Sequence, residues 1–370
     1  MSTFLDFLLM VALVGEIAIC TPLDQQCLCS NGEAAQFVDI CVRSNCTVKE
    51  QLAAKNASQT ACHATVRDET MLISGFGLGG GAVALLAFAL RALSRMTSQP
   101  ANCGMDDYMM MLAMVAIIPF SVFSLILARN GLGKDIWTLS PDNIDRVLYV
   151  YYIDEPLYLA STALTKISIL YFYLRIFPNE SFRRATATLI ACCIAYFIVF
   201  ATVSVFQCRP ISAAWKHWDG EHSGECNNVN AQGWACAVAN IILDISIIML
   251  PLPQLAKLKM SVGKKARLFA ILSVGLFVTL VSVLRLESLI QFANSENPTW
   301  EYVQMGYWST IEVHTGVVCA CMPAISSLLF RSIRKPAGNS EHHGKDGSSV
   351  HICRASFELG PASKSSNASM

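Results

Sequence analysis

Residues 268–284 read LFAILSVGLFVTLVSVL, and this stretch decides the fold class. Its only polar side chains are the hydroxyls of Ser273, Thr279 and Ser282, so no charge interrupts it. A helix of about 20 apolar residues crosses the hydrocarbon core of a bilayer. Six other runs have a similar length and are mostly apolar. The sequence therefore predicts seven spans, at roughly 71–94, 107–128, 147–174, 186–207, 232–253, 267–289 and 304–330.

The composition agrees with a membrane protein. Apolar residues make up 54% of the 370 residues and charged residues only 15%, whereas soluble domains have about 25% charged residues. A soluble chain of this composition would need an unusually large dry core. The formal net charge is +0, and nothing in it indicates a nucleic-acid partner.

The segment before the first span is polar and rich in cysteine. Six cysteines fall within it, a density typical of a disulfide scaffold in an oxidising compartment: Cys20, Cys27, Cys29, Cys41, Cys46 and Cys62. Glycosylation sequons at Asn45 and Asn56 agree with a location outside the cytosol. We therefore expect residues 20–69 to form an extracellular domain. The apolar residues 1–19 are either a signal peptide or the first helix of that domain.

Lysine and arginine in the short loops predict the orientation of the bundle, residues 70–335. With the N-terminal domain outside, the inner loops have ten of these residues and the outer loops five. Because cytoplasmic loops carry the excess of positive charge, this orientation places the C-terminus in the cytosol. Residues 336–370 are polar and are predicted to be a disordered cytoplasmic tail.

Charged residues inside the predicted spans are candidates for function, because each costs about 2.5–3.5 kcal/mol to insert. We expect one group to line a ligand cavity in the outer half of the bundle: Asp154, Glu155, Tyr158, Arg285 and Glu312. Within it, Arg285 and Glu312 are expected to pair, since their helices are consecutive. Lys166 and Asp244 are predicted to pair in the inner half. The alternative for both groups is that they only fix helix packing.

The remaining cysteines suggest one further disulfide. Cys208 and Cys226 are the two cysteines of the second outer loop, and a bond between them would close it; the alternative is two buried thiols. We expect the cysteines within spans or on the cytosolic side to stay free: Cys103, Cys192, Cys193, Cys236, Cys319 and Cys321. The glycine run at 75–81 is expected to allow close helix packing.

The cysteine spacing in the N-terminal segment resembles a known module. The pattern from Cys20 through Asp24 and Cys27 to Cys29, followed by Cys41, Cys46 and Cys62, is similar to the second part of a CFEM domain, a fungal extracellular module with eight cysteines. The first two have no counterpart here, so either the chain begins late or the module is degenerate. In CFEM modules that bind haem, the aspartate at this spacing is the axial iron ligand. The resemblance thus implies this role for Asp24; the alternative is a helix N-cap.

The rest of the chain resembles the fungal rhodopsin-domain membrane proteins, a seven-helix family that includes signalling receptors. The similar stretches include GMDDY at 104–108, NGLGKDIW at 130–137, LTKISILYFYLRIFP at 164–178 and LPLP at 250–253. No lysine lies between Gln304 and Phe330 in the seventh span, which argues against a retinal Schiff base.

These observations favour an all-α membrane protein with a small disulfide-rich helical head and a receptor-like function. The first hypothesis is a GPCR-like sensor in the cell membrane that binds an extracellular cue and couples to a heterotrimeric G protein. The alternatives are a membrane-tethered haem- or iron-binding protein and a transporter. No hydrolase, metalloprotease or Walker A motif is present, so we do not expect an enzyme.

Overall fold

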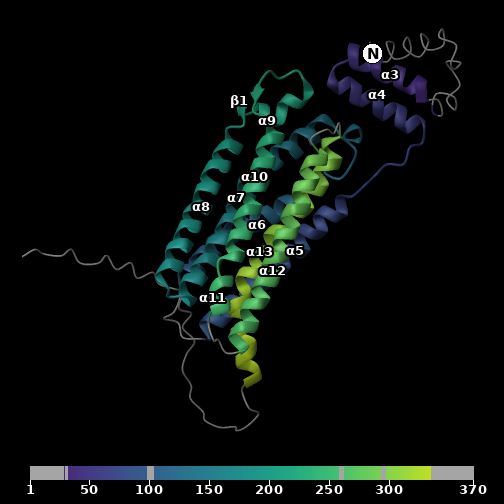
Figure 1. The fold of residues 1–370 in the computed structure, drawn as a ribbon. Helices are drawn as coiled ribbons and strands as arrows, with labels where there is room; N and C mark the ends of the chain where they lie inside the picture. The colour runs from purple at the N-terminus through teal and green to yellow at the C-terminus, as the bar shows by residue number, and fades with distance from the viewer. Residues whose placement is uncertain (1–28, 30–31, 98–103, 258–261, 293–296, 335–370) are drawn as a thin grey trace, which may run out of the picture.

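The computed structural model describes residues 29, 32–97, 104–257, 262–292 and 297–334. Two short helices, α3 (Gly32–Asn45) and α4 (Val48–Ala61), form the head. In these ranges seven long helices form the bundle: α5 (Thr70–Met96), α6 (Met105–Arg129), α7 (Pro141–Ile176), α8 (Glu180–Val205), α10 (Val229–Met249), α12 (Val262–Phe292) and α13 (Pro298–Arg334). The head lies beyond one end of the bundle, here called the head end (Figure 1).

Short elements connect the long helices. At the head end these are η2 (Ile136–Thr138), α9 (Ala213–Lys216), η3 (His217–Asp219) and the two-stranded antiparallel sheet of β1 (Cys208–Arg209) and β2 (Glu225–Cys226). At the other end, here called the far end, α11 (Leu252–Lys257) follows α10. The two strands place Cys208 directly opposite Cys226.

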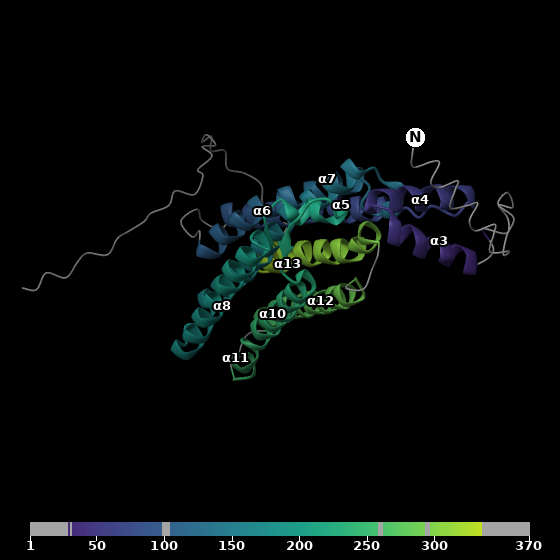
Figure 2. The same cartoon turned by 90° about the horizontal axis from the view of Figure 1, so that it is seen from above.

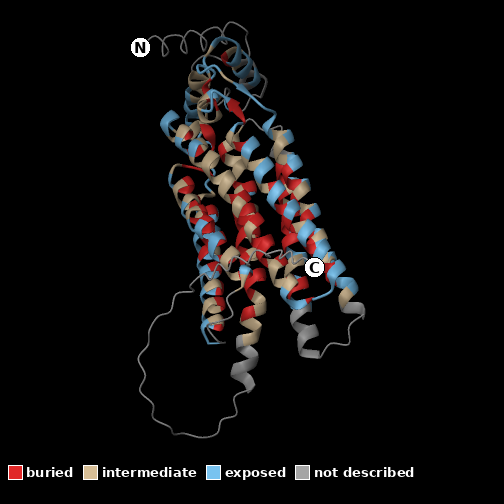
Figure 3. Ribbon diagram, turned by 90° about the vertical axis from the view of Figure 1, so that its left-hand side faces the viewer, coloured by how far each residue is buried: buried red, intermediate tan, exposed pale blue. Residues whose placement is uncertain are grey.

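The predicted fold class is confirmed. Six described helices, α5, α6, α7, α8, α10 and α12, are long and apolar enough to cross a membrane. Buried residues gather in the interior of the bundle (Figure 3). Apolar residues such as Val115 and Leu276 are exposed. An exposed apolar surface on helices of this length indicates contact with lipid.

The seventh long helix, α13, can hold buried polar side chains because it packs inside the bundle. It contacts α5, α12 and α7, and the view from above shows it between the α5–α7 side and α12 (Figure 2). Glu312 and His314 are both buried on this helix. A helix surrounded by protein can hold polar side chains that a lipid-facing helix cannot.

Helix α7 starts earlier than the sequence predicted, at Pro141 rather than near residue 147. Proline is well suited to the first helical position because its missing N–H would have no partner there. The helix has 36 residues and a length of about 54 Å, which exceeds a hydrocarbon core of about 30 Å. Its first turns therefore project at the head end, where Tyr149 and Tyr152 pack against Trp215.

The glycine run in α5 lets this helix approach its neighbours closely. A Cβ atom at Gly80 would lie 2.2 Å from Nδ1 of His314, and one at Gly77 would lie 2.5 Å from Cβ of Ser124. His314 is held in this position by a contact of 2.9 Å between its Nε2 and Oγ of Ser121. The run is thus a packing surface against α6 and α13, as the sequence predicted.

This contact predicts the effect of a single methyl group. Gly80→Ala should destabilise the bundle by about 1–3 kcal/mol, the usual cost of overpacking. Gly79→Ala is the matched control, because nothing lies within 4 Å of that position; it should be neutral or stabilising, since alanine favours helix by about 1 kcal/mol. Thermal unfolding of the detergent-purified variants measures both. Equal losses would show that the contact with His314 is not the cause.

Candidate functional site

A buried ion pair lies inside the bundle between α7 and α10. Nζ of Lys166 is 2.7 Å from Oδ1 of Asp244, and it also donates a hydrogen bond of 2.7 Å to Oδ1 of Asn240, one turn away on α10. Both charged side chains are less than one-tenth exposed. The structure therefore brings together the two residues that the sequence analysis paired.

Glu312 on α13 lies beside this ion pair and is surrounded by neutral donors. Its Oε1 accepts hydrogen bonds from Nδ2 of Asn240 and, at 2.8 Å, from Oγ of Ser282. Ser282 Oγ is also 3.3 Å from Oδ2 of Asp244. Asn240 and Ser282 thus connect Glu312 to the Lys166–Asp244 pair from two sides.

The predicted direct pair of Arg285 and Glu312 is wrong, because the hydroxyl of Tyr158 lies between them. This hydroxyl donates to Oε2 of Glu312 at 2.9 Å and accepts from NH1 of Arg285 at 2.6 Å. The guanidinium carbon also lies 4.0 Å from the centroid of the Tyr158 ring, a cation–π arrangement. Similar depths for the two charges could be predicted from the span limits, but nothing there indicated that a tyrosine from α7 would separate them.

Seven residues therefore form one buried network, which we call the core network: Tyr158, Lys166, Asn240, Asp244, Ser282, Arg285 and Glu312. It joins α7, α10, α12 and α13. The sequence analysis treated the inner pair and the outer group as separate, whereas the structure connects them. Two cationic and two carboxylate side chains give the network a formal charge of zero, which suits a low-dielectric interior.

A cavity of about 50 Å³ adjoins the core network. Its polar lining includes Thr162, Lys166, Asp244 and Glu312, and Gly275 and Gly316 leave space on the opposite helices. About 10–15 Å³ of such volume is needed to hold one water molecule, so this cavity has room for a few waters. Of the five residues predicted to line a ligand cavity, Glu312 is part of this lining. The rest of the polar lining belongs to the Lys166–Asp244 pair and its neighbours.

Asp154 and Glu155 lie outside the core network, nearer to the head end. Oδ1 of Asp154 is buried and has no hydrogen-bond partner among the described residues. Glu155 lies next to Ser204 of α8 and Gln232 of α10. Their part in a ligand site stays a prediction.

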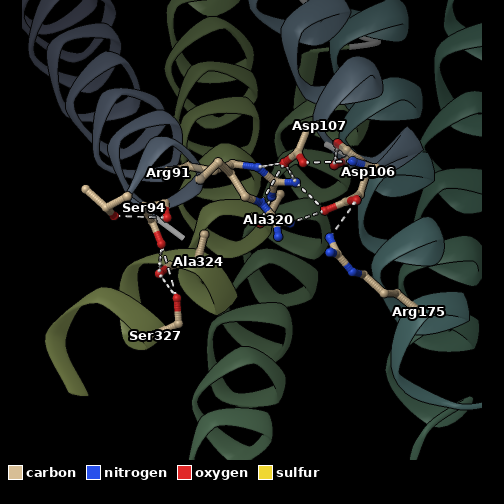
Figure 4. A network of polar contacts seen from close by, with 12 residues as sticks. Arg91, Ser94, Asp106, Asp107, Arg175, Ala320, Ala324 and Ser327 are labelled. Carbon is tan, nitrogen blue, oxygen red and sulfur yellow. Dashed lines mark hydrogen bonds and ion pairs between the residues drawn. The ribbon is translucent and has the colours of Figure 1, made fainter. Parts of the chain in front are cut away.

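A second polar cluster, at the far end, was missed by the sequence analysis. The sequence analysis included Arg91 only among the ten lysine and arginine residues of the inner loops, whereas in the structure its side chain is buried, at 3% exposed. Its NH2 lies 2.7 Å from Asp106 and 2.8 Å from Asp107, and its NH1 donates to the carbonyl of Ala320 at 2.6 Å (Figure 4). Arg95 contacts the same two carboxylates.

This far-end cluster connects four helices. Ser168 of α7 donates to the backbone carbonyl of Asp106 at 2.7 Å, and Arg175, at the end of α7, reaches to 3.8 Å from Asp106 (Figure 4). The signal available in the sequence was the spacing. Arg91 and Arg95 are four residues apart on one helix face, and the aspartate pair begins the next helix.

The described residues contain one disulfide in the second outer loop and one in the head. Cys208 is bonded to Cys226 across the second loop, and Cys29 is bonded to Cys62 in the head. The free cysteines in the described bundle include Cys192, Cys193, Cys236, Cys319 and Cys321. Cys20, Asp24, Cys27 and Cys103 lie outside the described residues, as does the predicted tail.

No metal site is evident in the described ranges, where no group of three or more His, Cys, Asp or Glu side chains is arranged to hold an ion. Asp24, the haem ligand that the CFEM resemblance implies, lies outside these ranges.

Comparisons with known proteins agree with this architecture. The sequence profile described as the fungal rhodopsin domain matches residues 90–331, more than half of the chain. The protein belongs to the fungal rhodopsin domain family. A CFEM domain profile matches residues 11–63, and both resemblances stated above are thereby confirmed. No solved structure matches the chain.

Several curated fungal proteins are similar to this family member. A SAT4 family membrane protein of Emericella nidulans is 28% identical over 211 residues, which cover 56% of this chain and 52% of that protein. Wortmanamides biosynthesis cluster protein C of Talaromyces wortmannii is 24% identical over 68% of this chain and 67% of its own length. Receptor GIN3 of Arthrobotrys oligospora is 25% identical over 48% of this chain and 43% of its own length. The chain spans about half the length of the SAT4 relative, and these matches support a receptor-like role in a membrane.

The core network predicts non-additive effects of substitution. Lys166→Met leaves the Asp244 carboxylate buried without its cation, which should cost about 3–5 kcal/mol. Lys166→Met combined with Asp244→Leu should recover most of this loss, because replacing both partners by apolar groups is often neutral. Fluorescence-detected size-exclusion chromatography after graded heating measures the folded fraction. A double variant no more stable than the worse single one would contradict the pairing.

Proposed function

We propose that this membrane protein is a GPCR-like receptor of the cell membrane, with the head outside and the C-terminus in the cytosol. It senses an extracellular or surface cue and passes the signal to a heterotrimeric G protein without catalysing a reaction itself. The relative named Receptor GIN3 supports the receptor class. The excess of lysine and arginine in the loops of the far end supports the orientation.

The core network is the observation that carries this proposal. It fixes α7 against α13 through the bond from Tyr158 to Glu312 and fixes α7 against α10 through Lys166 and Asp244. A shift of α13 relative to α7 must break at least one of these contacts and expose a buried charge to an apolar environment. Such a core allows a few discrete arrangements of the helices and not a continuous range of helix positions. A receptor needs discrete arrangements of this kind to switch between states.

Removal of one hydroxyl tests the proposal. Tyr158→Phe keeps the ring but loses the hydrogen bonds to Arg285 and Glu312. Hydrogen bonds to charged groups contribute about 1.5–3 kcal/mol, so the basal rate of nucleotide exchange on a co-expressed fungal G protein should change by about tenfold or more. Tyr173→Phe, buried on the same helix but outside the core network, is the control. If no variant, nor the unchanged protein, stimulates exchange, the G-protein part of the proposal is wrong.

The orientation has its own test. Asn45 and Asn56 are both exposed on the head, and each begins a sequon, so endoglycosidase treatment of the protein from fungal membranes should lower its mass. Replacing both asparagines by glutamine should abolish that shift. A shift that depends instead on Asn179, which lies between α7 and α8 at the far end, would invert the orientation.

A second candidate function is binding of haem or iron by the head. The CFEM profile match at residues 11–63 favours it, and by the family resemblance Asp24 would supply the axial carboxylate. Haem absorbance of the purified full-length protein, compared with an Asp24→Ala variant, separates this candidate from a head that has no cofactor.

A further inference from the structure

The head is attached to the bundle at two separate places. The first is the connection between α6 and α7, which contains η2. Arg67, in the linker that follows the head, forms a bidentate ion pair with Asp135, and its guanidinium lies 4.3 Å from the ring centroid of Trp300 on α13. Lys55 of α4 lies 4.5 Å from the ring centroid of Trp137 in η2.

This first place is joined firmly to the start of α13. Asp135 is 2% exposed and accepts a further hydrogen bond, of 2.7 Å, from Nδ2 of Asn297. Oδ1 of Asn297 in turn accepts from the backbone of Ile136 at 2.9 Å. Thr299 donates to the carbonyl of Lys134 at 2.9 Å. These contacts connect Arg67 to the first turn of α13.

The second place is η3 in the disulfide-closed loop. Nζ of Lys49 on α4 lies 3.0 Å from Asp219 and 2.7 Å from Glu221. Burial opposes ionisation of Asp219, but hydrogen bonds from Lys49 and from the backbone of Glu221 and His222 hold its pKa below the ordinary value. The carboxylate is thus charged at neutral pH, and protonation would weaken the contact only in strongly acidic solution.

This second place is joined to α7. Nε1 of Trp218 in η3 donates a hydrogen bond of 2.6 Å to Oδ1 of Asp145, and the neighbouring Trp215 packs on Tyr149 and Tyr152. All three partners are on the projecting part of α7. The first docking place is therefore joined to α13 and the second to α7, the two helices that share the Tyr158–Glu312 hydrogen bond.

We propose that the head end of the bundle is a docking surface for the CFEM head, and that the docked head sets the spacing of α7 and α13 and thereby the geometry of the core network. The partner of this surface is the basic face of α4 and its linker, formed by Lys49, Lys55 and Arg67. It fits an acidic and aromatic surface formed by Asp135, Trp137, Asp219, Glu221 and Trp300. This inference goes beyond the proposed function, and a failure of G-protein exchange would leave it intact.

The exposure of the pairs indicates that docking is reversible. The side chains of Lys49 and Arg67 are 34% and 48% exposed, and such pairs are individually weak and screened by salt. A cue that binds the head and competes for this basic face can therefore release it. Each charge reversal should lower the ratio of docked to released head by up to about fivefold.

The test uses the full-length protein in lipid nanodiscs. The double variant Lys49→Glu with Arg67→Glu should increase amide hydrogen exchange in residues 136–138 and 217–219. N-ethylmaleimide should also react several-fold faster with Cys319, which lines the cavity beside the core network, in this variant than in the unchanged protein. The labelling rate of the exposed Cys192 is the reference. Arg209→Glu is the matched control, because it reverses an exposed charge at the head end that has no ion pair in the described structure.

Three outcomes overturn the inference or support it. Unchanged exchange in both segments would show that these contacts do not dock the head. Faster exchange with an unchanged labelling ratio would show that docking is not transmitted to the core. Partial recovery of the exchange in residues 217–219 on adding Glu221→Lys to Lys49→Glu supports it; recovery is partial because Asp219 still faces the new glutamate. Global unfolding is recognised because it also exposes the buried Cys193; the milder Lys49→Gln with Arg67→Gln is then measured instead.

Discussion

The hydroxyl of Tyr158 separates two charges that lipid does not accept, and the interior of the bundle is organised around it. The hydroxyl donates its proton to Glu312 and accepts a hydrogen bond from Arg285. Each charge therefore has a polar partner, and the hydroxyl is polarised by both. Hydrogen bonds in such a chain strengthen one another in a low-dielectric interior. Because the partners come from α7, α12 and α13, the position of each of these helices depends on the other two.

The polar contacts of the chain occur at three levels along the same helices. At the head end, α7 and α13 are tied to the loops and the head; in the middle, they share the core network; at the far end, Ser168 and Ala320 bind the Arg91–Asp106 cluster. The apolar side chains between these levels pack without directional bonds, and the small residues of α5 allow close approach. Both α7 and α13 take part at every level, which explains why these two helices carry so many polar side chains.

Sequence patterns predicted the features that depend on local chemistry. Runs of apolar residues gave the helices, and paired cysteines in one loop gave the candidate bond between Cys208 and Cys226. The Lys166–Asp244 pair followed from depth and opposite charge. Contacts that depend on helix rotation could not be predicted in this way. Arg91 stands near the end of a span, as a loop anchor does, and the sequence does not show that α5 turns it toward Asp106. Nor does it show that Arg285 of α12 reaches Tyr158 of α7.

The zero formal charge of the core network has a consequence for the electrical environment of the membrane. Moving one elementary charge across a membrane potential of 100 mV changes the free energy by about 2.3 kcal/mol. Lys166 and Arg285 are matched by Asp244 and Glu312 within the same cluster, so a rearrangement that moves these four groups together carries no net charge through the field. A membrane potential therefore adds little to the free energy of any rearrangement that keeps these four groups together.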